Sequence, residues 1–317
     1  MMTDPDNLCY APGTMIVGKW HRNRYQLIRL LGSGAQGTVY LGHSGDAHPV
    51  AIKLAKDRSS LISEAHILEQ FGRLQGDPLG PSLYDSDDWV TGGSTVGFCV
   101  MEYLEGTSLS EVLKKKAFDW SLVYVLQLLK QLAQLHKTGY IFGDLKPENL
   151  MLIRPGYSIR CLDFGGATKI GRSVREYTEF YDRGYWGLGS RRAEPSYDLF
   201  ACAMILIYAA AGRRITRSSE PQNQLKHFID SQGKLVPYRH FLLSALSSDY
   251  TSAEQMRKEL VRAMMAVESH ERHNSHAAAA RYPRPRTKRK SNGWTPAWLA
   301  ASMIITAYIV FVVIYVM

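Results

Sequence analysis

A glycine-rich segment between two strand-like segments places the strongest constraint on how this chain can fold. Gly32, Gly34 and Gly37 have the spacing Gly-x-Gly-x-x-Gly, a pattern that also occurs in dinucleotide-binding folds. In those folds the last glycine opens a helix, but Gly37 is followed by residues 38–41, Thr-Val-Tyr-Leu, which have the composition of a strand. The sequence therefore predicts a glycine-rich hairpin whose backbone N–H groups can close over phosphate groups.

Five further elements follow this hairpin in a defined order. They are residues 50–53 (Val-Ala-Ile-Lys), Glu64, residues 144–149 (Asp-Leu-Lys-Pro-Glu-Asn), residues 163–165 (Asp-Phe-Gly) and Asp198. Lys53 comes nineteen residues after Gly34, and Asp163 comes nineteen residues after Asp144. One element alone could occur by chance, whereas the full set in this order is typical of a protein kinase.

Over roughly residues 13–265 the chain resembles the bacterial eukaryotic-like (Hanks-type) serine/threonine protein kinases. The resemblance implies an α+β, bilobal fold with a β-rich N-terminal lobe and an α-helical C-terminal lobe. It also implies transfer of the γ-phosphate of ATP to serine or threonine hydroxyls of protein substrates, with Mg²⁺ or Mn²⁺ as the metal. The residues that the resemblance assigns to nucleotide binding are Leu31, Gly32, Ser33, Gly34, Ala35, Gln36, Gly37, Thr38, Val39, Ala51, Lys53, Met101, Glu102 and Leu104.

The same resemblance assigns a role to Lys53. It would hold the α- and β-phosphates and be oriented by a carboxylate from the helix that follows. Glu64 is the candidate for that carboxylate, and Glu69 is the alternative because the connection from Lys53 is short for the family. The two glutamates are five residues apart and do not share a helix face, so only one of them can reach Lys53.

The catalytic loop would carry the remaining chemistry. Asp144 would be the base that accepts the proton of the substrate hydroxyl. Lys146 would neutralise charge on the transferring phosphoryl group, and a lysine at this position is typical of serine/threonine kinases. Asn149 and Asp163 would supply oxygen ligands, which suit the hard Mg²⁺ ion. Asp198 would brace the catalytic loop from the start of an apolar helix.

The sequence departs from the family pattern in two places. Phe142 and Gly143 stand where the family usually has His-Arg before the base, so the chain resembles a "non-RD" kinase without a cation to clamp a phosphorylated activation segment. Residues 183–188 (Arg-Gly-Tyr-Trp-Gly-Leu) replace the usual Ala-Pro-Glu, and residues 247–254 contain no arginine. We therefore expect both partners of the family's ion pair between these two regions to be missing.

Two other functions are compatible with part of this sequence pattern. Small-molecule kinases of the aminoglycoside-phosphotransferase type share the bilobal fold and often have a Gly-Asp pair before the base, as in Gly143-Asp144. Lys146, the glycine-rich hairpin and Asp198 favour a protein kinase over this class. A catalytically weak kinase fold that serves as a membrane or DNA-binding scaffold is the second alternative, which the retained phosphoryl-transfer residues oppose.

Periodicity predicts the main elements of both lobes. Strand-like segments cover residues 25–31, 38–43, 50–54 and 96–101, and a helix covers about residues 61–74. Residues 101–104 resemble the hinge between lobes, with Met101 gating the adenine pocket. Apolar residues at helical spacing over 122–136 predict a long helix that ends in a packed His136. Residues 199–211 are almost wholly apolar but too short to span a membrane, so they predict a buried helix.

The cysteine and charge patterns bear on the cellular compartment of the protein and on where its positive charge lies. The four cysteines are scattered singly, which indicates neither a zinc site nor a disulfide framework, and reduced cytosol is the expected environment. No N-terminal signal peptide is visible. The net charge is +9, and seven basic residues with no acidic ones follow Glu271. The excess charge therefore belongs mostly to residues 272–290 rather than to the kinase domain.

The resemblance implies a kinase domain over residues 13–267, preceded by an N-terminal extension, 1–12. Charge and hydropathy add two further parts: 268–293, a disordered basic juxtamembrane linker, and 294–317, one C-terminal transmembrane helix. Residues 297–317 carry no charge and are long enough to span a bilayer. The basic linker assigns their preceding end to the cytoplasm, which predicts a single-pass anchor in the cell membrane with a cytoplasmic kinase domain.

The linker and anchor also predict partners. The clustered cations of the linker would bind anionic lipid or DNA. Small residues spaced along the anchor, at 297/301 and 302/306, favour pairing of two copies as a homodimer. The combination of kinase, basic linker and terminal anchor is similar to a membrane-tethered, DNA-responsive type of kinase in spore-forming bacilli.

Overall fold

The computed structural model describes residues 8–34, 36–72, 78–154 and 156–281. The chain divides into two units, residues 1–268 and residues 269–317. The first unit contains the whole of both lobes. Of the second unit, only residues 269–281, the end of the last helix, are described.

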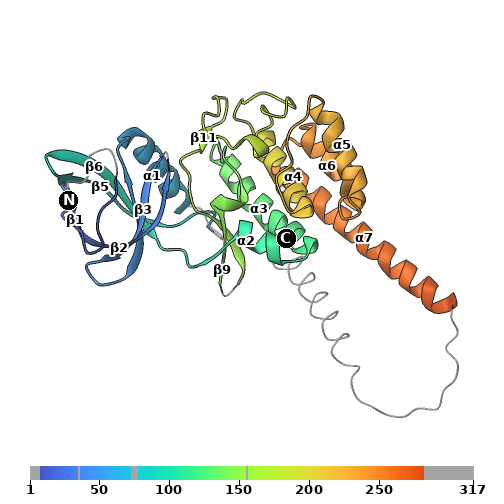
Figure 1. Cartoon of the computed structure of the whole chain (residues 1–317), viewed down its shortest axis with the longest axis horizontal. Helices are drawn as coiled ribbons and strands as arrows, with labels where there is room; N and C mark the ends of the chain where they lie inside the picture. Colours follow the sequence, from blue (N-terminus) through green and yellow to red (C-terminus); the bar gives the residue numbers. More distant parts are fainter. Residues whose placement is uncertain (1–7, 35, 73–77, 155, 282–317) are drawn as a thin grey trace, which may run out of the picture. The chain divides into compact units, whose positions relative to one another are not determined.

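The N-terminal lobe is a six-stranded antiparallel sheet with one helix (Figure 1). Its strand order is β1-β2-β3-β4-β6-β5. Alternate residues of the central strands, such as Tyr40, Ile52 and Phe98, point into one apolar core, as the period of a half-buried strand requires. The elements are β1 (Met15–Val17), β2 (Arg24–Gly34), β3 (Gly37–Ser44), β4 (Pro49–Ala55), α1 (Arg58–Gly72), β5 (Leu83–Thr91) and β6 (Ser94–Glu102).

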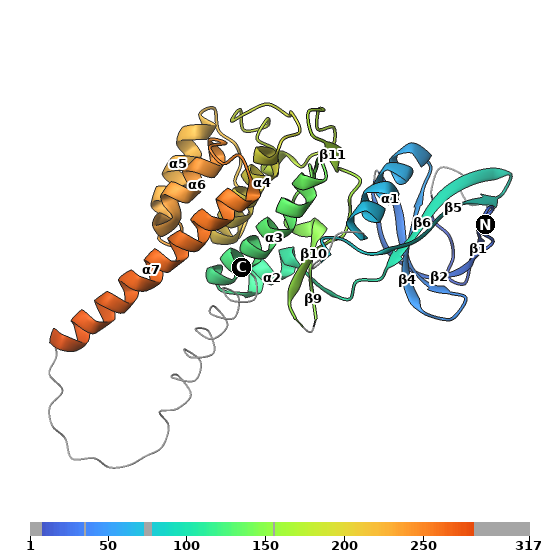
Figure 2. The same cartoon turned by 180° about the vertical axis from the view of Figure 1, so that it is seen from behind.

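The C-terminal lobe is mainly helical (Figure 2). It also contains a small sheet with the strand order β10-β9-β7 and a two-stranded pair, β11-β8. The elements are β7 (Gly106–Ser108), α2 (Leu109–Lys115), α3 (Phe118–Lys137), β8 (Tyr140–Ile141), η1 (Pro147–Asn149), β9 (Leu150–Ile153), β10 (Ser158–Cys161), β11 (Thr168–Lys169), η2 (Glu179–Tyr181), α4 (Pro195–Ala211), α5 (Pro221–Ser231), η3 (Val236–Tyr238), α6 (Arg239–Leu246) and α7 (Ala253–Arg281).

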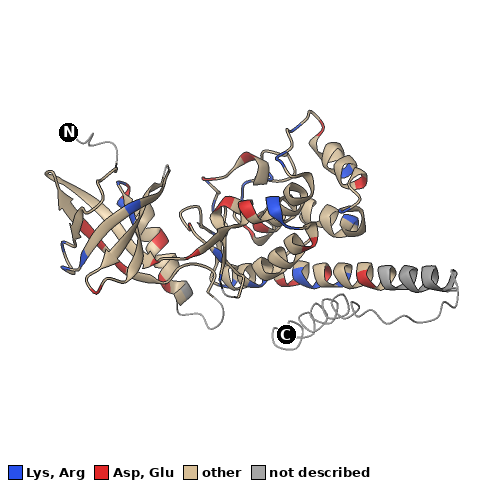
Figure 3. Cartoon of the chain, turned by 60° about the horizontal axis from the view of Figure 1, so that its bottom comes forward, with Lys and Arg blue, Asp and Glu red and all other residues tan. Residues whose placement is uncertain are grey.

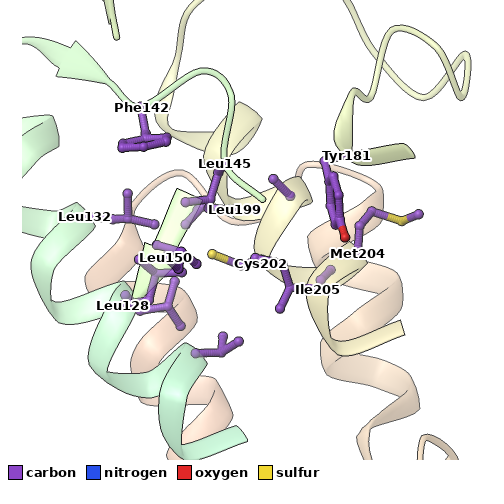
Figure 4. Close-up of a cluster of buried hydrophobic side chains, with 14 of the residues drawn as sticks. Leu128, Leu132, Phe142, Leu145, Leu150, Tyr181, Leu199, Cys202, Met204 and Ile205 are labelled. Carbon is purple, nitrogen blue, oxygen red and sulfur yellow. The ribbon is translucent and has the colours of Figure 1, made fainter. Parts of the chain in front are cut away.

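Helix α4 is the centre of this lobe. Every residue from Ser196 to Tyr208 is buried, and burial of each large apolar side chain contributes about 1.5–3 kcal/mol. Figure 4 shows Leu128 of α3 and Cys202 of α4 beside Leu145 of the catalytic loop and Leu150 of β9. The buried helix predicted at 199–211 is therefore present, and its packing ties the catalytic loop to the core.

Two element boundaries differ from the predictions. The helix expected at 61–74 is α1, which begins three residues earlier, because Asp57 Oδ1 accepts a hydrogen bond from the Ser59 amide (2.9 Å) and caps its first turn. In the predicted N-terminal extension, residues 8–12 are described. Leu8 is buried there, and its carbonyl accepts a hydrogen bond from Tyr40 Oη (3.0 Å). That part of the extension belongs to the N-terminal lobe.

The division of the chain into two units, between residues 268 and 269, lies one residue from the predicted start of the linker. The predicted disorder of the first part of the linker is wrong, because helix α7 continues through it to Arg281. The helix includes four consecutive alanines at 277–280, and alanine has the highest helix propensity, whereas the prediction weighed only low apolar content and like charge. The rest of the linker and the predicted anchor, residues 282–317, lie outside the described residues. Within the described ranges, no helix combines the length and apolar character that a membrane span needs.

Candidate active site

One face of the N-terminal sheet gathers several of the predicted nucleotide-binding residues. Strand pairing sets Val39 opposite Lys53 and Ala51 opposite Met101. Residues directly opposite share a face, and so do residues two apart on one strand. Val39, Ala51, Lys53 and Met101 therefore project from the same side of neighbouring strands β3, β4 and β6.

Lys53 is held by two carboxylates. Its ammonium donates hydrogen bonds to Glu64 Oε2 at 2.6 Å and to Asp163 Oδ1 at 2.9 Å. The Lys53 and Glu64 side chains are only 5% and 2% exposed. Glu69 lies on the exposed side of α1. Of the two candidate carboxylates, Glu64 is therefore the one that pairs with Lys53. The carboxylate of Glu64 also accepts a hydrogen bond from the Phe164 amide (3.3 Å), which joins α1 to the Asp-Phe-Gly motif.

Burial and charge act together on this group of three. Burial lowers the pKa of the Lys53 ammonium, but the carboxylates of Glu64 and Asp163 outweigh it and raise that pKa. Burial raises the pKa of Glu64 to about 7 although Lys53 opposes it, and the negative charge of Asp163 adds to the rise. Lys53 therefore stays protonated at neutral pH, as a phosphate-binding cation must.

The catalytic loop forms a second charged network. Thr178 Oγ1 donates a hydrogen bond to Asp144 Oδ1 (2.9 Å) and accepts one from Lys146 Nζ (3.0 Å). The Lys146 ammonium lies 2.5 Å from Asp144 Oδ2. These three contacts tie the candidate base to the activation segment, which we define as residues 163–194. They hold the Asp144 carboxylate beside a cation at a partly exposed position, where a substrate hydroxyl can approach.

Asp198 braces the catalytic loop from the start of α4. Its Oδ2 accepts a hydrogen bond from the Phe142 amide (2.8 Å), and its Oδ1 accepts one from the Gly143 amide (3.0 Å). The side chain of Asp198 is fully buried. Its two charge-assisted hydrogen bonds therefore fix the backbone directly ahead of Asp144.

His136 supplies a third contact to Asp198 that sequence reasoning missed. His136 Nε2 lies 2.8 Å from Asp198 Oδ2, and the imidazole is almost wholly buried. A carboxylate only accepts hydrogen bonds, so this nitrogen donates. We predicted a packed histidine, and its position at the end of the helix that leads into the catalytic loop was the available signal. Its partner lies 62 residues further on, which local periodicity cannot reveal.

An ion pair lies within the activation segment itself. Arg183 is buried and its Nη2 donates a hydrogen bond to Glu194 Oε1 at 2.6 Å. Its Nη1 donates to Ser196 Oγ (2.9 Å) and lies 3.3 Å from Ser248 Oγ, in the region 247–254 that contains no arginine. The pair of Arg183 with Glu194 is therefore a different one from the family's pair between residues 183–188 and 247–254.

The glycine-rich hairpin reaches toward Lys53. Gln36 Nε2 donates a hydrogen bond to Glu176 of the activation segment, and Gln36 Oε1 accepts one from Lys53 Nζ (3.4 Å). A cavity of about 350 Å³ lies between the hairpin, the start of α1 and Glu176. Ala35, at the tip, lies outside the described residues. The predicted hairpin residues are paired as Gly32 with Val39, Ser33 with Thr38, and Gly34 with Gly37.

The remaining predicted nucleotide-binding residues lie in β2, just ahead of the glycine-rich turn, and in the hinge. Leu31 is exposed on β2, whereas Met101 and Leu104 are buried. The carboxylate of Glu102 accepts a hydrogen bond from Arg160 Nη2 at 2.8 Å. Glu102 Oε2 also accepts one from the Ser82 amide (3.1 Å), so its side chain joins the hinge to the segment ahead of β5.

The residues expected to hold a metal fit that role by their donor chemistry. Asn149 Nδ2 donates a hydrogen bond to the Asp144 carbonyl (3.0 Å), and Asp163 Oδ1 accepts bonds from Lys53 and from the Gly165 amide (3.0 Å). These bonds use the nitrogen of Asn149 and one oxygen of Asp163. The amide oxygen and the second carboxylate oxygen are hard donors of the kind that Mg²⁺ prefers.

Comparison with known proteins agrees with this geometry. The family model for the protein kinase domain matches residues 25–282. The chain is 46% identical over 252 residues to the serine/threonine-protein kinase YabT of Bacillus subtilis (strain 168), an alignment that covers 79% of this chain and 74% of that protein. It is 29% identical over 177 residues to the serine/threonine-protein kinase PknG of Mycobacterium leprae (strain TN), which covers 50% of this chain and 21% of that protein.

A third similarity extends over most of the chain. The chain is 24% identical over 270 residues to the probable serine/threonine-protein kinase CPE1738 of Clostridium perfringens (strain 13 / Type A). This alignment covers 78% of this chain and 38% of that protein. Each of these relatives is described as a serine/threonine-protein kinase, and none as a small-molecule phosphotransferase. The chain therefore belongs to the protein kinase family and is a serine/threonine protein kinase of the bacterial Hanks type.

Proposed function

We propose that Asp144 is the catalytic base of this kinase and that Lys53 binds the α- and β-phosphates of ATP. The observation that carries the assignment is the hydrogen-bonded network of Asp144, Lys146 and Thr178, because it joins a carboxylate, a cation and the activation segment at one partly exposed point. The opposed lobe presents Lys53, which Glu64 and Asp163 hold protonated.

The reaction follows from this arrangement. The substrate hydroxyl oxygen forms a bond to the γ-phosphorus of ATP, the bond from that phosphorus to the β,γ-bridging oxygen breaks, and ADP leaves. Asp144 accepts the hydroxyl proton, while Lys146 stabilises negative charge on the transferring group. Asn149 and Asp163 would hold Mg²⁺, which supplies neutralisation of charge on the phosphates. Mn²⁺ is an acceptable substitute, since it shares the preference for oxygen donors.

Substitution tests these roles directly. Asp144→Asn and Lys53→Ala should each lower autophosphorylation on serine or threonine by several orders of magnitude, since positioning and charge stabilisation supply most of the catalysis. Asp46→Asn is the matched control, because Asp46 is an exposed carboxylate in the β3–β4 turn. The readout is ³²P labelling with phosphosite mapping. Labelling of Asp144→Asn at the wild-type rate would refute the assignment of the base.

We further propose that the kinase acts at the cytoplasmic face of the cell membrane. The support is the uncharged stretch 297–317 together with the preceding basic cluster. Membrane fractions should retain the full chain and release a variant truncated after residue 293. Protease added outside intact cells should leave the kinase domain uncut, and digestion of that domain would overturn the orientation.

The basic linker is proposed to bind anionic lipid or DNA through charge alone. Six cations lie between residues 281 and 290, and each could contribute ~1 kcal/mol near an acidic leaflet. Binding of vesicles and of DNA should fall steeply with salt and should be lost when the six are replaced by glutamine. Equal binding of wild type and variant would leave the cluster as a topology signal only.

A further inference from the structure

The carboxylate of Glu148 in the catalytic loop is bound by an arginine from a distant loop. Arg214, in the connection between α4 and α5, places its Nη2 2.6 Å from Glu148 Oε1. The same guanidinium lies over the ring of Tyr181, 5.4 Å from its centroid. The side chains of Arg214 and Glu148 are 43% and 42% exposed, so the pair lies at the surface and is open to a bound peptide.

This pair lies beside the candidate base. Glu148 is in η1, four residues after Asp144, and Tyr181 comes three residues after Thr178, which donates its hydrogen bond to Asp144. A protein segment that presents its hydroxyl to Asp144 must cross the surface next to these residues. The charges of the Arg214 neighbourhood therefore act on the residues that flank the phosphorylated serine or threonine.

A second arginine of the same loop faces the activation segment. The guanidinium of Arg217 lies over the ring of Tyr185, 5.6 Å from its centroid, and Arg217 is exposed. Within the described part of the chain, Arg217 has no carboxylate partner. Stacking on an aromatic ring leaves the edge of a guanidinium free to donate hydrogen bonds to a carboxylate.

One of the two cations is already neutralised. Arg214 and Glu148 neutralise each other, and Asp182 is buried and bound to Arg191 at 2.7 Å, so Arg217 is the cation that remains for a substrate carboxylate. Glu179, exposed at the start of η2, and Glu220, exposed three residues after Arg217, are the opposing charges. Both signs of charge are interspersed over the described chain (Figure 3).

We propose that Arg217, with Arg214 neutralising Glu148, gives this kinase a preference for protein substrates with acidic residues beside the phosphorylated serine or threonine. Guanidinium groups bind carboxylates through paired, charge-assisted hydrogen bonds. Glu148, the carboxylate of the catalytic loop that could attract a basic substrate side chain, is already neutralised. The inference rests on the proposed function, since it assigns the substrate class of the same site.

Two peptides test the proposal with the full-length kinase in detergent micelles. They share one serine and all other residues, but aspartate flanks the serine in one and arginine in the other. Wild type should show a kcat/KM about 10-fold higher for the acidic peptide, mainly through KM, and the ratio should shrink as salt screens the charges. The double variant R214A/R217A should lose that ratio. Arg262→Ala is the matched control, because Arg262 pairs with Glu259 on the exposed side of α7.

Further variants separate charge from folding. Arg214→Ala frees Glu148 and should raise kcat/KM for the basic peptide, and adding Glu148→Gln should remove that rise. Arg214→Lys keeps the positive charge but lacks the paired N–H donors of a guanidinium, so it should retain part of the preference for the acidic peptide. This variant remains informative if the alanine variant unfolds.

The outcomes distinguish a failure of the proposed substrate preference from a failure of the proposed kinase function. Wild type that labels both peptides equally, or prefers the basic one, would overturn the specificity and leave the kinase activity intact. An unchanged acidic preference in the folded double variant would overturn the role of the two arginines. Wild type that labels neither peptide nor itself would refute the proposed function, and the inference with it.

Discussion

Gly143 lies so close to the carbonyl of Gly166 that a Cβ atom on Gly143 would meet that oxygen at 2.4 Å. Gly143 also has a φ of +82°, a conformation that other residues rarely adopt. The residue before the candidate base is therefore a glycine for steric reasons. The usual arginine could not occupy this position without moving either the catalytic loop or the Asp-Phe-Gly region.

This geometry predicts that restoring the arginine inactivates the enzyme. Gly143→Arg and Gly143→Ala should both lower activity at least 10-fold and reduce stability by about 1–3 kcal/mol from backbone strain alone. Gly171→Ala is the control, because Gly171 also has a positive φ but no atom near its Cβ position. The measurements are thermal unfolding and labelling rate. Equal losses at both glycines would show that the contact with Gly166 is unimportant.

Glu64 and Glu69 should respond differently to the same change. Glu64→Gln removes the charge that holds Lys53 and should lower kcat about 100-fold, as expected for loss of a kinase ion pair, whereas Glu69→Gln should have little effect. Since burial raises the pKa of Glu64 to about 7, and only the ionised carboxylate holds the ammonium, activity should fall as pH decreases through about 7. Glu64→Gln should lack this pH dependence, and a full pH response in that variant would assign it to another group.

The three hydroxyls of the activation segment should not be equivalent. A kinase without the arginine clamp should tolerate Thr168→Ala and Ser173→Ala. Thr178→Ala should lose about 10- to 100-fold in kcat, because a hydrogen bond to a charged group contributes about 1.5–3 kcal/mol and Thr178 bonds both Asp144 and Lys146. Thr178→Ser should retain most of the activity. Loss in the alanine variant without rescue by serine would indicate a packing role for the methyl group.

Arg183 should contribute to the free energy of unfolding, because its side chain is buried although arginines usually lie at the surface. Arg183→Ala leaves the Glu194 and Ser248 side chains without their cation and creates a cavity where a buried guanidinium lay. We expect a loss of about 1.5–3 kcal/mol, the contribution of a hydrogen bond to a charged group, because the Glu194 carboxylate left behind is 42% exposed and stays hydrated. Arg192→Ala, at an exposed position, is the control. Urea unfolding measures both, and similar small losses would exclude a structural role for Arg183.

Local patterns determined much of this protein from the sequence. Alternating apolar residues predicted the central strands, and the apolar run at 199–211 predicted α4, because burial of one face imposes these periods on neighbouring residues. The resemblance of the motifs around Lys53, Asp144, Asn149 and Asp163 to those of protein kinases predicted one phosphoryl-transfer site.

Tertiary structure decided the contacts that join distant segments. It placed Glu64 rather than Glu69 on Lys53, and it brought His136 to Asp198, 62 residues away, and Arg214 to Glu148, 66 residues away. It also paired Arg183 with Glu194 and Ser248, contacts that no motif predicted. Such pairs depend on how whole helices and loops pack, since a charge can be satisfied by any partner that the fold brings within reach. The periodicity and the spacing of residues in the sequence therefore do not predict which residue pairs with a given charged side chain.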